Sequence, residues 1–130
     1  MEKIKLSEVF SINADELFNA WMNSKKHSDF TGGKAIIQSK VGGKFTAWDG
    51  YISGKTLELK PYSKIIQAWR TTEFPNYAPD SKLEILFDEL KTGTRLTLIH
   101  SNIPEGQGKN YEKGWIEFYF EPMKLYFSKK

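Results

Sequence analysis

Hydrophobic and polar residues alternate along much of the chain, and this alternation is typical of half-buried β-strands. Segment 4–10, with the sequence IKLSEVF, alternates in this way and predicts a first strand. Turn-forming residues separate the later alternating segments, so strands are predicted near 34–40, 43–49, 51–60, 64–73, 82–90 and 94–102. Asp49-Gly50 predicts a tight hairpin, and Gly54 within a strand predicts a bulge or a bend.

Two short segments after the first strand have a helical pattern instead. Asn13 is a favourable N-cap residue, and Glu16 follows it three residues later as in a capping box. We therefore expect a helix over about 14–22 and a second, shorter helix over 24–29.

The C-terminal segment 110–128 predicts a long helix of unusual composition. Its polar side chains recur every three or four residues in one stripe, and most of the other positions are apolar. A helix that is apolar over most of its circumference is expected to be covered on most sides. Pro122 lies in its middle and is expected to kink the helix and to free the carbonyl of Phe118.

These elements predict an α+β fold in which a curved antiparallel sheet wraps around the long C-terminal helix, with two short helices after the first strand. The 130 residues show no shift in composition, so we expect one domain, 1–130. Aromatic residues make up 15% of the chain. This content indicates either a large core or an aromatic-lined cavity between sheet and helix.

Charge and composition exclude several kinds of site. The 19 basic and 16 acidic residues give a net charge of +3, spread along the chain, so nucleic-acid binding is not expected. Cysteine is absent, which rules out disulfides and thiolate metal sites. Two histidines without clustered carboxylates predict no metal site, and we expect no cofactor. No segment approaches the roughly 20 apolar residues of a membrane span, so membrane insertion is not expected and a cytoplasmic location is.

The candidate functional residues are those expected to face the space between sheet and helix. Aromatic side chains there would stack on an apolar ligand or simply fill the core, and the orientations of Trp48 and Trp69 are left open by the pattern. The candidate cavity residues are Trp48, Tyr51, Trp69, Phe87, Leu98, His100, Trp115 and Tyr119.

Three titratable residues have alternative interpretations. His100 alternates with inward-facing leucines, so it is either a general base or ligand contact, or a buried histidine that is hydrogen-bonded; the second interpretation is favoured. His27 lies in a polar stretch and is expected to be solvated. Glu8 shares the inward parity of its strand, and we expect a bulge to turn it outward.

Several sequence blocks resemble one known family. Segments 42–54 (GGKFTAWDGYISG) and 65–70 (IIQAWR) resemble the signature of the Hsp90 ATPase activator C-terminal-domain-like family, in the START-like (SRPBCC, helix-grip) superfamily. Segments 96–100 (LTLIH) and 114–127 (GWIEFYFEPMKLYF) resemble its next block and its final helix. The resemblance implies a helix-grip fold with a hydrophobic cavity, and a partnership with an Hsp90-type chaperone.

Pattern and resemblance together leave three functional hypotheses. The first is a non-catalytic protein that binds an apolar small molecule in the cavity, with His100 and the Tyr51 or Tyr119 hydroxyl as polar contacts. The alternative is a co-chaperone-like module that binds and modulates an Hsp90-type ATPase; it ranks second because 130 residues hold no room for the N-terminal domain of two-domain activators. The third is an enzyme with His100 or Glu8 as base, and it is the least favoured.

Overall fold

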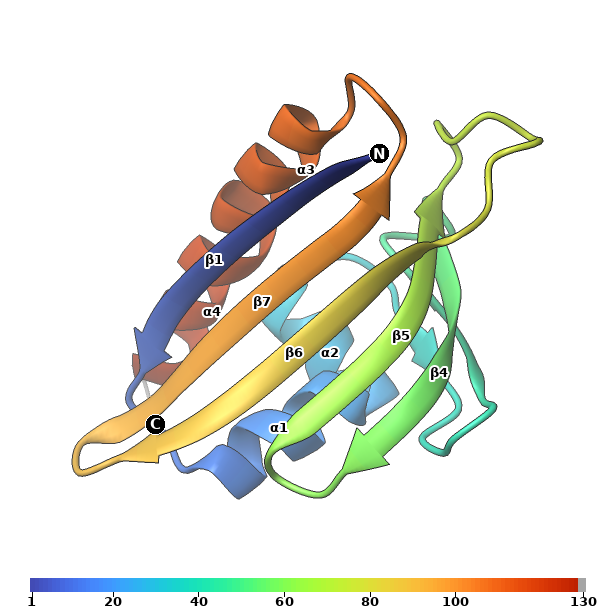
Figure 1. Ribbon diagram of the computed structural model, residues 1–130. Coiled ribbons are helices and arrows are strands. Elements are labelled where there is room, and N and C mark those ends of the chain that lie inside the picture. The colour runs from blue at the N-terminus through green and yellow to red at the C-terminus, as the bar shows by residue number, and fades with distance from the viewer. Residues whose placement is uncertain (129–130) are drawn as a thin grey trace.

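A seven-stranded antiparallel sheet carries the helices on one of its faces (Figure 1). The computed structural model describes residues 1–128, and the strand order across the sheet is β1-β7-β6-β5-β4-β3-β2. The strands are β1 (Glu2–Phe10), β2 (Ile36–Ile37), β3 (Lys44–Ala47), β4 (Ile52–Lys60), β5 (Lys64–Thr71), β6 (Ser81–Leu90) and β7 (Gly93–Ile103). The predicted α+β class with a curved antiparallel sheet is confirmed.

The helices come from two parts of the chain. After β1 follow α1 (Ala14–Met22) and α2 (Ser24–Thr31), close to the predicted ranges. The C-terminal helical segment consists of α3 (Gly108–Gly114), a π-helical segment η1 (Trp115–Phe120) and α4 (Glu121–Ser128). Within residues 1–128, no helix is both long and apolar enough to cross a membrane.

The short strands at the β2 edge differ most from expectation. The strands predicted over 34–40 and 43–49 are shorter in the structure: β2 has two residues and β3 has four. Trp48 and Asp49 adopt left-handed backbone conformations, with φ of 52° and 58°, and this turn ends β3. Gly54 is not at the register shift of β4, which lies between Thr56 and Glu58. A Cβ atom on Gly54 would stand 2.0 Å from the carbonyl oxygen of Ala68, so glycine is needed for close strand approach.

The C-terminal helix leaves one face exposed, which contradicts the expectation that it is enclosed on most sides. Phe118 and Leu125 remain 54% and 66% exposed. The sheet covers one side of the helix and α2 packs against η1 and α4, but no element among residues 1–128 covers Phe118 and Leu125. Pro122 follows the π-helical segment directly. The hydrogen-bonding pattern before Pro122 changes to that of a π-helix, with the Glu121 N–H donating to the Ile116 carbonyl, and the kink at Pro122 stays a prediction.

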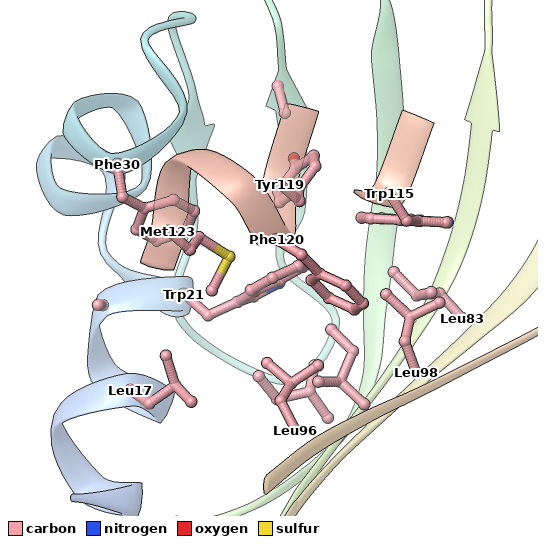
Figure 2. Packing of buried hydrophobic residues seen from close by; sticks show 14 of the residues in the cluster. Leu17, Trp21, Phe30, Leu83, Leu96, Leu98, Trp115, Tyr119, Phe120 and Met123 are labelled. Atoms are coloured by element: carbon pink, nitrogen blue, oxygen red, sulfur yellow. The ribbon is translucent and has the colours of Figure 1, made fainter. Parts of the chain in front are cut away.

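Apolar side chains from α1, from the sheet and from the C-terminal helix fill most of the space between the sheet and the helices (Figure 2). Leu17 and Trp21 reach it from α1, while Leu96 and Leu98 reach it from β7. Met123, from α4, is fully buried among them. Most of the predicted cavity is therefore occupied by core side chains, and open space is left toward one end of the helix only.

Candidate functional site

A pocket of about 250 Å³ opens between the C-terminal helix and the β3–β5 end of the sheet. Seven of its ten lining residues are aromatic. The lining residues are Trp48, Tyr51, Ile52, Trp69, Asn110, Tyr111, Gly114, Trp115, Phe118 and Tyr119. Five of the eight candidate residues thus meet around one space.

The pocket has a buried floor and an open mouth. Trp69 and Trp115 form the floor; each is 3% exposed, and their ring centroids lie 5.6 Å apart. Tyr51 and Phe118 stand at the mouth, with exposures of 36% and 54%. A ligand entering here would pass exposed rings before reaching the buried indoles.

Trp48 reaches the mouth because of an unusual local backbone. Its left-handed φ costs on the order of 1–3 kcal/mol for a residue other than glycine, and such strain is concentrated at functional sites. Gly33 provides the space for its indole, since a Cβ atom there would stand 2.4 Å from the ring. The Trp48 ring meets Phe118 edge to face, with centroids 5.8 Å apart. The open question of orientation is thereby answered: both Trp48 and Trp69 face the pocket.

The π-helical segment supplies one wall of the pocket. Trp115, Phe118 and Tyr119 all belong to it. Segments of π-helix are rare and occur frequently at functional sites. Sequence reasoning missed Phe118 and Tyr111, although both lie within the C-terminal segment singled out for its aromatic content, four and eleven residues before Pro122.

His100 does not line the pocket. The Trp115 indole N–H donates to His100 Nδ1 at 3.2 Å, so the ring proton is on Nε2 and is donated to Ser81 Oγ at 2.7 Å. Ser81 in turn donates to the carbonyl of Trp69 at 2.8 Å. Burial lowers the pKa of His100 to about 3, and the ring stays neutral. The favoured interpretation, a buried hydrogen-bonded histidine, is confirmed, and the role of polar contact to a ligand is not available to it.

His27 is also buried, and the expectation that it is solvated is wrong. Its Nδ1–H donates to the carbonyl of Trp21 at 2.8 Å, and its Nε2 accepts the hydroxyl proton of Tyr119 at 2.9 Å. Desolvation lowers the pKa of His27 to about 4. Burial raises the pKa of Tyr119, whose hydroxyl is thus occupied behind the pocket wall. A sequence signal for this burial was available: Phe30 follows His27 by three residues, so both side chains lie on one face of α2.

The polar groups at the mouth form hydrogen bonds with one another. The Tyr51 hydroxyl donates to the carboxylate of Glu73, and desolvation raises the pKa of Tyr51. Tyr111 donates to Gln107 Oε1 at 2.6 Å and accepts from Thr71 Oγ1 at 2.7 Å. These bonds hold the start of the C-terminal helix against the end of β5.

The other sequence-predicted residues lie elsewhere. Phe87 packs against Phe18, with ring centroids 5.5 Å apart, and Leu98 is fully buried in the core. Glu8 keeps its inward parity opposite Leu96, because the register shift of β1 lies between Glu2 and Ile4. The predicted outward turn of Glu8 is therefore wrong; Lys124 Nζ reaches its carboxylate at 3.2 Å instead. No group of three potential metal ligands occurs in residues 1–128.

Known proteins that are similar to this chain in sequence and in structure share its fold. The human "Activator of 90 kDa heat shock protein ATPase homolog 1" is 29% identical over 125 residues, which are 96% of this chain and 37% of that protein. The chain thus spans little more than a third of this curated relative. A solved HSP90 activator from Plasmodium falciparum is 25% identical with a TM-score of 0.91, covering 98% of this chain and 97% of that one. A Mesorhizobium loti protein, 20% identical with a TM-score of 0.82, covers 99% of this chain and 98% of its own and shows the fold alone.

The family model confirms the resemblance found in the sequence blocks. It matches residues 11–128, a range that includes the pocket and all three helical parts of the C-terminal segment. The chain belongs to the family of Activator of Hsp90 ATPase homolog 1-like proteins.

Proposed function

We propose that this protein binds an apolar small molecule in the aromatic pocket, without catalysing a reaction. The single observation that carries the proposal is the pocket itself, with seven aromatic side chains around about 250 Å³ of open space. Apolar pockets with a few polar groups are typical ligand sites. Each well-oriented ring contact adds roughly 0.5–1.5 kcal/mol to the effect of area burial.

The hydrogen bonds around the floor support an apolar ligand. The Trp115 indole N–H is donated to His100, and the Tyr119 hydroxyl proton is donated to His27. Neither of these two donors is therefore free to bind a ligand, and a ligand over Trp115 meets ring surface. The proposed ligand is bound mainly by burial and ring contacts.

Filling the pocket tests this proposal. Gly114 lines the pocket on α3, and a Cβ atom there would meet nothing nearer than Phe118 at 4.0 Å. We expect Gly114→Met to place its side chain in the open space and Gly114→Ala to leave most of that space free. Titration of ¹⁵N-labelled protein with 1-naphthol should shift the indole signals of Trp48, Trp69 and Trp115 in the wild type and in Gly114→Ala.

The methionine variant should lose these saturable shifts while its spectrum stays that of a folded protein. Mass spectrometry of organic extracts from the purified wild type would then search for a natural ligand. Absence of saturable shifts in the wild type, or shifts that persist in Gly114→Met, would overturn the proposal.

A second candidate function is that of a module that binds and modulates an Hsp90-type ATPase. The observation that favours it is family membership, together with the Plasmodium falciparum chain described as an HSP90 activator, which this chain matches over 97% of its length. A domain of this size alone therefore carries that description in a relative.

Titration of labelled protein with the unlabelled Hsp90 homologue of its source organism tests the second function. Saturable broadening on one contiguous surface, with a changed ATP turnover of the chaperone, is the expected result. An unchanged spectrum and unchanged turnover at high micromolar chaperone would refute it. Repeating the titration with Gly114→Met would show whether the interface includes the pocket.

A further inference from the structure

The charge distribution around the pocket restricts the chemistry of its ligand. No lysine, arginine or histidine is among the ten lining residues of the described chain. The titratable residues of the lining are Tyr51, Tyr111 and Tyr119, and desolvation raises the pKa of each, so they are neutral. The faces of aromatic rings carry negative electrostatic potential. The lining of the pocket therefore offers an anion no cationic partner, and it offers a cation several ring faces.

Within residues 1–128, one carboxylate is hydrogen-bonded to a side chain of the pocket lining, and it lies at the mouth. Glu73 accepts the hydroxyl proton of Tyr51, which is one of the exposed mouth rings. Lys113, next to the lining residue Gly114, has its Nζ 3.8 Å from Glu117. The backbone N–H groups of Gly106 and Gly108 lower the pKa of Glu2, and the charge of Lys109, next to Asn110, adds to this effect. The basic side chains adjoining the lining on α3 are thus directed to other carboxylates.

From this arrangement we propose that the pocket selects molecules with an alkylated ammonium group, bound at the mouth among Trp48, Tyr51 and Phe118. The apolar remainder of the molecule lies over Trp69 and Trp115 on the floor. This inference rests on the proposed binding function and gives the chemical class of its ligand. A quaternary ammonium suits the site because it has no N–H to leave unsatisfied and because ring faces attract it at distances within about 6 Å.

Glu73 adds to this selectivity by its charge. Its carboxylate accepts a hydrogen bond from the Tyr51 hydroxyl, and Tyr51 is one of the three mouth residues that would surround the ammonium group. An ammonium at the mouth would therefore lie near both the ring and the carboxylate. An anionic ligand of equal shape would meet repulsion from the same group.

Ligands that share a naphthyl group and differ in charge test the inference, and the ammonium and its uncharged analogue also have the same shape. The probes are (1-naphthylmethyl)trimethylammonium, its uncharged analogue with a tert-butyl group in place of trimethylammonium, and 1-naphthylacetate. Dissociation constants would come from NMR titration of the wild type. We expect the ammonium to bind at least about fivefold more tightly than the uncharged analogue, since cation–π attraction contributes roughly that factor or more. The carboxylate should bind the most weakly.

Variants separate charge from shape. Glu73→Gln should weaken binding of the ammonium and leave binding of the uncharged analogue unchanged. Glu112→Gln serves as the matched control, because that carboxylate is on α3 and does not line the pocket. Phe118→Leu should reduce the preference for the ammonium by removing one exposed ring at the mouth.

The outcomes distinguish this inference from the proposed function. Equal or tighter binding of the uncharged analogue overturns the ammonium preference and leaves the apolar-ligand function standing. Failure of both probes to bind, with 1-naphthol also silent, overturns both. An ammonium preference that survives Glu73→Gln overturns the part assigned to that carboxylate.

Discussion

The two buried histidines predict a steep loss of stability in mild acid. In the unfolded chain both imidazoles bind a proton near pH 6.5, the ordinary value. In the folded protein burial lowers the pKa of His27 to about 4 and that of His100 to about 3. Between these values the unfolded state binds more protons than the folded state. The stability that depends on the two neutral histidines is therefore fully present above pH 6.5. It decreases as the pH falls from 6.5 toward the folded-state pKa values.

The size of the effect follows from the two pKa differences. Each histidine lowers the free energy of unfolding by about 1.4 kcal/mol for every pH unit below 6.5. The two together should give a slope approaching about 2.7 kcal/mol per pH unit. From pH 7 to pH 5 the loss amounts to about 4 kcal/mol, against a total of roughly 5–15 kcal/mol for a domain. Stopping at pH 5 keeps Glu2 and Glu58, whose pKa values are lowered from 4.5, outside the window.

Urea denaturation followed by tryptophan fluorescence at half-unit steps from pH 7.5 to 5 measures this slope. His27→Gln and His100→Gln should each reduce it from about two protons to about one, whatever the absolute stability of the variant. The slope thus reports protonation and is independent of packing losses. A flat stability profile between pH 6.5 and 5, or an undiminished slope in both variants, would refute the assignment of these side chains as buried and neutral.

Three further substitutions test the packing and hydrogen bonds. Gly54→Ala should destabilise the protein by about 1–3 kcal/mol in urea denaturation, because its Cβ would overlap the carbonyl of Ala68; an unchanged midpoint would contradict this. Gly114→Ala, in an α-helical conformation with free space around it, should instead stabilise by about 0.4–1 kcal/mol, seen as a raised thermal midpoint. Ser81→Ala should cost about 1–3 kcal/mol, since the Nε2–H of His100 loses its partner; a loss below the error of a urea titration would show that the bond is dispensable.

Local sequence signals predicted the regular elements well. The alternation of segment 64–73 became β5, whose buried and half-buried positions alternate along its whole length. The helix start near Asn13 was placed correctly, yet its side chain makes no capping bond. The Ala14 N–H is bonded instead by Glu89, 75 residues away in β6. A partner brought in by tertiary structure has thus taken the role that the local motif predicted.

The errors about single side chains have the same cause. His27 looked solvated because its sequence neighbours are polar, but Trp21 and Tyr119 close over it from two other parts of the chain. Phe118 looked buried because the helix is apolar, yet it stands at an open mouth. Periodicity describes one element at a time, and the cover that each face receives depends on elements far away in the sequence.

The change to π-helical bonding within the C-terminal helix has a consequence for how this fold varies. Such a segment accommodates a residue beyond what α-helical bonding would place in the same stretch. Removal of one residue between Trp115 and Phe120 would let the chain return to α-helical bonding locally. The helical parts on either side of the segment would keep their orientation, so Tyr111 before it and Met123 after it would still point toward the same neighbours. Insertion or deletion of a single residue, as well as substitution, is thus a route by which relatives can reshape the pocket wall while both anchoring ends of the helix stay in place.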